Sequence, residues 1–170
     1  AVTGVQTCAL PISTENSGQR GSVTAYFLIK FLHIVGAAVL LGTGSGIAFF
    51  MLLAHRTGRP AIVAATAHSV VVADTVFTAT AVVAQPITGA ILATMIGVPL
   101  TEPWVLTAIA LYLLTGAFWL PVVWMQIRMR DLARRAVAAD TELPPTYHRL
   151  FRIWFAFGFP AFAAVLVSFG

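Results

Sequence analysis

The sequence predicts an all-α fold, a four-helix transmembrane bundle with helical extensions on its cytoplasmic side. Of its 170 residues 59% are hydrophobic and only 9% are charged, and the mean hydropathy is +0.90. A soluble domain usually carries about 25% charged residues. A soluble chain of this length could not bury so much apolar surface. The apolar residues also fall into four long stretches, which indicates one membrane domain of a few spanning helices.

The first 22 residues are expected to lie outside this domain. The segment "AVTGVQTCALPIS", residues 1–13, resembles translated sequencing-adapter read-through and is interpreted as non-native. The polar segment "TENSGQRGS", residues 14–22, is expected to be disordered. Both ends of the chain resemble fragment ends, and the single cysteine, Cys8, excludes an intrachain disulfide. A single domain is then expected over 23–170, with helices near 26–54, 61–97, 103–139 and 147–170.

The second apolar stretch is too long for one crossing. An unbroken helix over 61–97 would measure about 55 Å, whereas the hydrocarbon core of a bilayer is about 30 Å thick. We therefore expect a division at Asp74, with 61–73 as a cytoplasmic extension and 75–96 as the crossing. Pro86 lies inside the crossing and should kink it near Val82, because proline lacks the N–H that would bond that carbonyl.

The remaining boundaries follow from prolines and charge. Pro60 and Pro103 suit the first turn of a helix, and "DTELPP" ends the third helix after its charged continuation "QIRMRDLARRAVAA". The positive-inside rule places the first and third loops in the cytoplasm and both chain ends outside. The arginines that carry this prediction are Arg56, Arg59, Arg128, Arg130, Arg134, Arg135, Arg149 and Arg152.

Polar residues of the second helix fall within a narrow arc. They are Asp74, Thr78, Gln85 and Thr88. Such a row usually faces a bundle interior or a water-filled cavity, so one interpretation is a site or proton path. The other is interhelical hydrogen bonding, with Asp74 at the cytoplasmic boundary and paired with Arg128 or Arg152.

Two further rows are interpreted as packing. Ala38, Gly42 and Gly46 form a stripe of small residues on the first helix, which is typical of close contact between membrane helices. The third helix places Tyr112, Thr115, Trp119 and Gln126 on one face. Aromatic packing with hydroxyl partners explains that face.

His33 stands almost alone as an ionisable group in the first apolar stretch. His55, His68 and His148 belong to the cytoplasmic side of the predicted topology. His55 follows His33 by 22 residues, about 33 Å of helix, so the two cannot share a metal. Met95, at the outer end of the second helix, is the candidate second ligand if His33 binds haem; otherwise the iron is five-coordinate or a second subunit contributes. The alternative to haem binding is that His33 is a neutral imidazole bonded to a neighbouring backbone group or hydroxyl.

Five stretches resemble a known family: "IKFLHIVGAAVLLGTG", "TAVVAQPITG", "PWVLTAIALYLL", "LPVVWMQIRMRDLARR" and "LPPTYHRLFRIWFAFGFPAF". Over about residues 26–170 the chain resembles predicted integral membrane proteins of domain of unknown function 2269. It is more distantly similar to bacterial HemJ-type protoporphyrinogen oxidases and copper-resistance D proteins, which share a first helix beginning Lys-x-x-His. That similarity implies His33, preceded by Lys30, as a ligand of haem b. It also implies the bacterial inner membrane as location.

Three functions remain open from the sequence. The protein binds haem or porphyrin through His33, or it is a non-catalytic scaffold or assembly partner, or it is a small transporter with Asp74 and Gln85 in its path. Whether it is an enzyme is left open, because no nucleotide motif, catalytic triad or metal-ligand cluster is present. The expected partners are membrane lipids, including anionic lipids at the arginine-rich helix, and a second copy of the chain. Nucleic acid is not expected.

Overall fold

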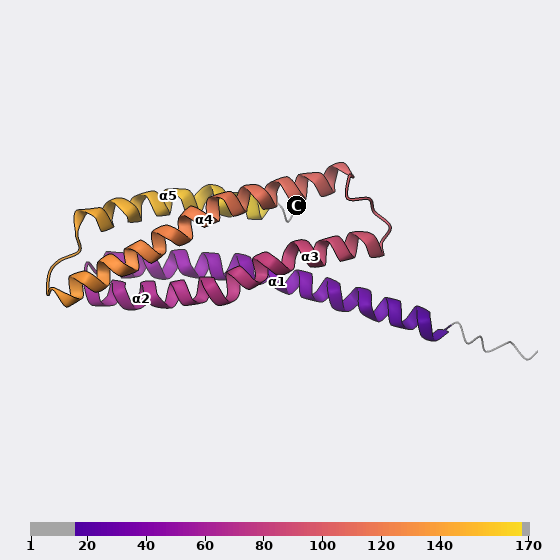
Figure 1. The fold of residues 1–170 in the computed structure, drawn as a ribbon, viewed down its shortest axis with the longest axis horizontal. Coiled ribbons are helices and arrows are strands. Elements are labelled where there is room, and N and C mark those ends of the chain that lie inside the picture. Colours follow the sequence, from indigo (N-terminus) through magenta and orange to yellow (C-terminus); the bar gives the residue numbers. More distant parts are fainter. Residues whose placement is uncertain (1–15, 168–170) are drawn as a thin grey trace, which may run out of the picture.

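The structure, a computed structural model, describes residues 16–167 as four helical rods joined by short loops (Figure 1). One rod is built from three consecutive elements, because a π-helix joins two α-helices without a break. The predicted all-α architecture of four helices is therefore confirmed. The elements are α1 (Asn16–Arg56), α2 (Pro60–Ala73), the π-helix η1 (Asp74–Thr78), α3 (Ala79–Met95), α4 (Pro103–Ala138) and α5 (Pro145–Val167).

Glycine and proline set the loops between the rods. Gly58 and Gly97 have φ angles of +65° and +72°, in the left-handed region that a residue without a Cβ adopts at little cost. Pro60 and Pro103 then begin α2 and α4, where the missing N–H would have had no helical partner. The first two loops follow from these local preferences.

The bundle core lies in one half of the molecule. α4 packs against α2 and α5, and α1 packs against α2 and α3. All four rods meet where Met51, Val63, Met129 and Tyr147 are fully buried. Within the described residues α5 runs beside only this half (Figure 1). The other half is formed mainly by α1 and α3 with the first part of α4.

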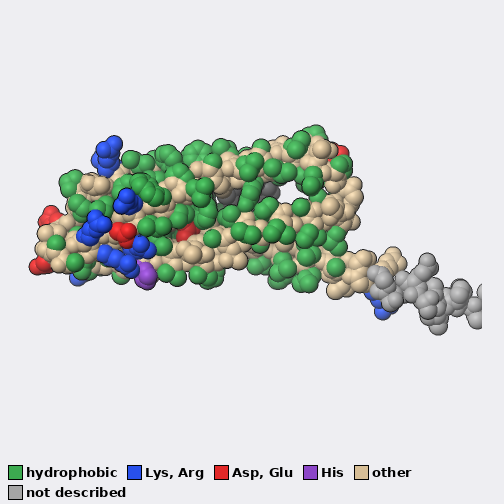
Figure 2. Space-filling view, in the orientation of Figure 1, with side chains coloured by type: hydrophobic (Ala, Val, Ile, Leu, Met, Phe, Trp, Pro, Cys, Tyr) green, Lys and Arg blue, Asp and Glu red, His purple; other side chains and the backbone are tan. Residues whose placement is uncertain are grey.

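Charge marks the end of the bundle nearest this core. We call it the basic end, the end that contains loops 57–59 and 139–144. Figure 2 shows arginine side chains gathered there, whereas hydrophobic side chains cover much of the remaining visible face. Apolar side chains more than 60% exposed occur along the rods: Phe27, Phe31, Val83, Leu113, Leu120, Phe159 and Val167. Such continuous apolar exposure suits lipid rather than water.

Three helical segments are long and apolar enough to cross a membrane: Gln19–Arg56, Pro60–Met95 and Pro103–Ala138. α5 does not meet the same criteria within the described residues, so its crossing stays a prediction.

The first helix begins earlier than expected. Residues 16–22, which we had assigned to a disordered leader, form the first turns of α1. Ser22 and Thr24 donate hydrogen bonds to the carbonyls of Gln19 and Arg20 in the preceding turn. No proline interrupts the helix before Pro60, and helix growth is cooperative once begun. The proposed adapter-derived residues 1–13 lie outside the described residues.

Two expectations require correction, one about the continuity of a helix and one about packing. Asp74 does not break the second rod: η1 keeps it helical over 60–95, a length of about 54 Å. The small-residue stripe of α1 does not pack against another helix among the described residues. A Cβ added at Gly42 or Gly46 would meet no atom within 4 Å among the described residues, and Ala38 is exposed. α1 therefore contacts its neighbours through its other face.

Candidate functional site

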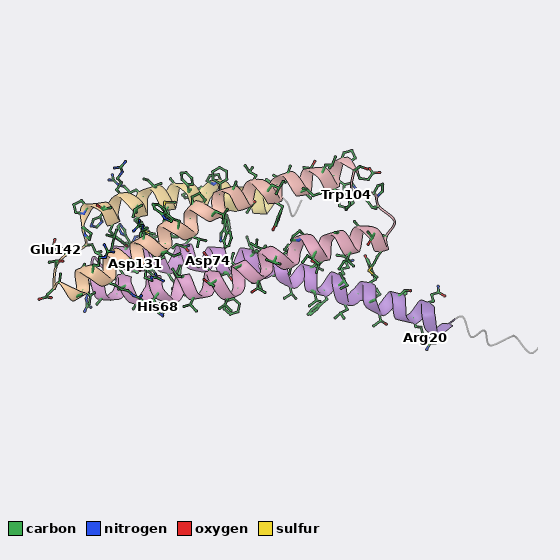
Figure 3. The ribbon with its side chains drawn as sticks, in the orientation of Figure 1. Arg20, His68, Asp74, Trp104, Asp131 and Glu142 are labelled. Atoms are coloured by element: carbon green, nitrogen blue, oxygen red, sulfur yellow. The ribbon has the colours of Figure 1, made fainter. Side chains whose placement is uncertain are left out.

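Asp74 is the buried acid of the bundle. It is the first residue of η1, and only 4% of its surface is exposed. Figure 3 shows it in the interior of the bundle, whereas Asp131 and Glu142 lie nearer the basic end. Trp119 of α4 donates a hydrogen bond from Nε1 to Asp74 Oδ1 at 3.3 Å. The aromatic face of α4, which we had interpreted as packing alone, thus supplies the partner of this acid.

The second oxygen of Asp74 has no partner among the described residues. Asp74 Oδ2 and the hydroxyl oxygen of Thr78 are both buried without a hydrogen bond of ordinary geometry, although Thr78 is near enough to act on the carboxyl group. The expected pairing of Asp74 with an arginine is wrong. Arg128 lies instead over the Trp124 ring at 5.6 Å, and Arg152 is exposed. The carboxyl group therefore has one N–H donor and no described cation beside it.

The π-helix determines where these two side chains point. A π-helix accommodates about one extra residue in a turn and is found frequently at functional sites. Here it begins at Asp74 and ends at Thr78, both of which are buried. Of the other rods, α1 packs against it. The local widening thus occurs where the only acid within the span Pro60–Met95 enters the bundle.

More buried polar atoms without partners lie between Asp74 and the basic end. They are Gln126 Oε1, Trp154 Nε1, Tyr147 OH and His55 Nδ1. His55 stacks on Phe151 with ring centroids 3.7 Å apart. Sequence reasoning missed Tyr147 and Trp154. The available signal was their seven-residue spacing, which puts them on one face of α5.

Tyr147 lies in the first turn of α5, outside the three candidate spans. Burial raises its pKa to about 12, because a phenolate loses hydration in the core. It is therefore a neutral phenol near neutral pH.

His33 takes part in two hydrogen bonds between α1 and α3. Its Nδ1 lies 2.8 Å from the hydroxyl oxygen of Thr88, and that hydroxyl lies 2.8 Å from the carbonyl oxygen of Ala84. A hydroxyl has one proton. If Thr88 donates it to Ala84 and accepts a bond from His33 Nδ1–H, all three groups are satisfied. His33 Nε2 then carries a lone pair. This nitrogen has no hydrogen-bond partner among the described residues, and protein atoms do not bury it completely.

Two glycines allow this close approach. Gln85 Nε2 donates to the backbone carbonyl of His33 at 2.8 Å, and a Cβ added at Gly36 would overlap that same nitrogen. A Cβ added at Gly89 would lie 3.3 Å from His33 Cε1. The predicted polar row therefore divides, because Gln85 and Thr88 contact α1 whereas Asp74 bonds Trp119 of α4.

Met95 is not part of the hydrogen-bonded contact around His33. It is 39% exposed and follows Thr88 by seven residues, about 10 Å along the helix axis. Its pairing with His33 stays a prediction. Among the described residues, no group of three or more His, Cys, Asp or Glu side chains could hold a metal ion.

Tyr112 supplies a hydrogen bond that Pro86 cannot make in the neighbouring rod. Pro86 has no N–H to bond the carbonyl of Val82, four residues earlier. Tyr112 of α4 donates its hydroxyl to that carbonyl oxygen at 2.7 Å. Membrane helices tolerate proline when another group satisfies the freed carbonyl. The proline therefore creates a specific link between α3 and α4.

The long apolar rods and the buried acid define a helical polytopic membrane protein. Comparison with known families makes the assignment specific: the chain belongs to the family described as "Predicted integral membrane protein (DUF2269)", which matches residues 27–170. The resemblance to this family seen in the sequence is confirmed. Searches of curated proteins and of solved structures each found no match.

Proposed function

We propose that this protein moves protons across the bacterial inner membrane through a polar path that contains Asp74. The observation that supports this is a carboxyl group 4% exposed, inside a candidate span, with no described cation partner. An isolated carboxylate is too costly in such surroundings and takes up a proton instead. Ionisable groups inside membrane spans often belong to proton relays or ion pathways.

The partner of Asp74 favours a proton over a metal cation as cargo. Trp119 directs an N–H donor at Oδ1, which places a partial positive charge where a cation would bind. Small hard cations also need several oxygen ligands, whereas Thr78 supplies the only other buried, unpartnered oxygen that we find within η1. A proton needs only one acceptor, such as the hydroxyl of Thr78.

Buried polar groups between Asp74 and the basic end support a path on that side of the acid. Gln126, Trp154, Tyr147 and His55 have buried, unpartnered atoms toward the basic end. Buried polar groups of this kind are commonly satisfied by internal water. Toward the other end, Gln85, Thr88 and His33 are hydrogen-bonded to one another in the contact between α3 and α1, so they are not counted as part of this path. By the positive-inside rule the basic end faces the cytoplasm.

The test is proton flux into proteoliposomes that contain a pH-sensitive dye and an imposed membrane potential. Wild-type protein should acidify or alkalinise the lumen faster than protein-free vesicles, and Asp74→Asn should abolish the difference. Asp131→Asn is the matched control, because Asp131 is an acid paired with Arg130 at 2.9 Å on the same bundle. It should retain wild-type flux. Flux unchanged in Asp74→Asn, or absent in the wild type, would leave a scaffold as the better interpretation.

His33 supports a second candidate function, the binding of haem or porphyrin. Thr88 holds Nδ1, and the assignment above leaves Nε2 as an available lone pair. A histidine ligand commonly has its other nitrogen bonded in this way. His33 thus fits an axial ligand, and a bound haem would supply one-electron redox chemistry.

Visible absorption of protein expressed with ample haem tests this second candidate. A Soret band that His33→Ala removes and Met95→Leu alters would support haem ligation by both residues. A band retained in Met95→Leu would leave His33 as the single protein ligand. A colourless wild-type protein would exclude haem binding and leave His33 as a packing contact.

A further inference from the structure

A pocket of about 260 Å³ opens between α4 and α5 at the basic end. From α4 it is lined by Leu132 and by four residues that follow one another at four, three and four positions: Trp124, Arg128, Asp131 and Arg135. This spacing places them on one face of the helix. Thr146 and Leu150 line it from α5. Its wall therefore changes from aromatic to basic along α4.

The two arginines of this pocket have no described acidic partner. The pocket's own acid, Asp131, is paired with Arg130, whose Nη2 lies 2.9 Å from Oδ1. Arg128 lies over the Trp124 ring, and neither Arg128 nor Arg135 has an ion pair among the described residues. The pocket therefore keeps a net positive charge.

The first turn of α5 adds to this charge. Thr146 is the second residue of that helix and brings a hydroxyl group to the pocket. The N-terminus of a helix carries a partial positive charge that favours anions. A phosphate between Arg128, Arg135 and Thr146 would be complementary in charge and would find hydrogen-bond donors.

Apolar side chains in the same pocket point to the source of the phosphate. Trp124 is 54% exposed, and Leu150 lies across from it on α5. Tryptophan is enriched where a helix leaves the hydrocarbon core. A free phosphate would cover neither side chain, whereas the glycerol and upper acyl chain of a lipid would cover both.

We propose that the pocket between α4 and α5 binds the phosphate headgroup of an anionic phospholipid from the cytoplasmic leaflet. The phosphate binds Arg128 and Arg135, and the apolar part of the lipid packs on Trp124 and Leu150. Arginine is well suited to this role because its planar fork donates two parallel hydrogen bonds to phosphate. This proposal is independent of proton movement at Asp74.

The full chain, purified in mild detergent, is titrated with dioctanoyl phosphatidylglycerol, dioctanoyl phosphatidylcholine and inorganic phosphate, and bound lipid is measured by native mass spectrometry. Phosphatidylglycerol should bind at least tenfold more tightly than phosphatidylcholine. Arg128→Gln/Arg135→Gln should lose about tenfold or more of that affinity, because each basic side chain near an anionic surface contributes roughly fivefold.

The matched control is Arg56→Gln/Arg59→Gln, which removes the same charge from exposed positions at the same end. It should keep wild-type affinity. Equal losses in both double variants would overturn the pocket in favour of diffuse charge attraction. Inorganic phosphate that binds as tightly as the lipid would overturn the lipid as ligand. If the double variant unfolds, Arg128→Gln alone should lose about fivefold, and wild-type affinity there would also overturn the proposal.

Discussion

The link between Pro86, Val82 and Tyr112 makes a quantitative prediction. Pro86 leaves the Val82 carbonyl without its helical donor, and Tyr112 supplies the replacement at 2.7 Å. Tyr112→Phe removes the hydroxyl and keeps the ring. In the wild type this change leaves a half-buried carbonyl unsatisfied. In a Pro86→Ala background the new N–H bonds Val82, so the hydroxyl of Tyr112 is no longer needed.

The magnitude follows from one hydrogen bond to one carbonyl. Leaving a buried acceptor unsatisfied costs about 1–3 kcal/mol, while hydrogen bonds between membrane helices average about 0.6 kcal/mol. We therefore expect Tyr112→Phe to lower the free energy of unfolding by about 1–2 kcal/mol in the wild type. In Pro86→Ala the same change should cost less than about 0.5 kcal/mol, so the coupling energy is about 1 kcal/mol.

Unfolding in mixed detergent micelles, followed by circular dichroism for all four proteins of the cycle, measures this coupling. Tyr112→Trp and Leu113→Ala serve as controls, the first for ring packing and the second for an exposed neighbour on α4. An equal cost of Tyr112→Phe in both backgrounds would refute the argument that the tyrosine substitutes for the missing N–H.

Two further predictions concern stability. Gly36→Ala should lower the free energy of unfolding by about 0.5–1.5 kcal/mol, because the new Cβ displaces the end of the Gln85 side chain from the carbonyl of His33. Gly42→Ala, where the added Cβ would meet no atom within 4 Å, should be neutral or slightly stabilising. Equal losses of stability in Gly36→Ala and Gly42→Ala would contradict the close contact between Gly36 and Gln85. Tyr147→Phe should be at least as stable at pH 7, because the Tyr147 hydroxyl is buried without a partner. Burial raises the pKa of Tyr147 from 10.0 to about 12. The free energy of unfolding of the wild type should therefore fall as the pH rises from 10 toward 12, by about 1.4 kcal/mol per pH unit. Tyr147→Phe should lack this contribution. A lower melting temperature of the Phe variant at pH 7 would show that the hydroxyl has a partner after all.

The membrane class and the helix boundaries could be predicted from the sequence, because both depend on local properties. Apolar stretches must be long enough for the bilayer, and prolines and glycines mark turns wherever they stand. Pro60 and Pro103 begin helices as expected, and the row of Tyr112, Trp119 and Gln126 does face the interior. The start of α1 was missed because polar residues next to a long helix can continue it.

The helix that each polar side chain contacts could not be predicted in the same way. Helical periodicity puts Asp74, Thr78, Gln85 and Thr88 on one arc, but a π-helix at the start of that arc and the crossing of α4 over α2 assign them to different neighbours. The sequence by itself determined that a lone acid and a lone histidine enter apolar helices. Only the tertiary structure decided that Trp119 rather than an arginine meets the acid, because side chains far apart in the chain become neighbours through the angle at which rods cross.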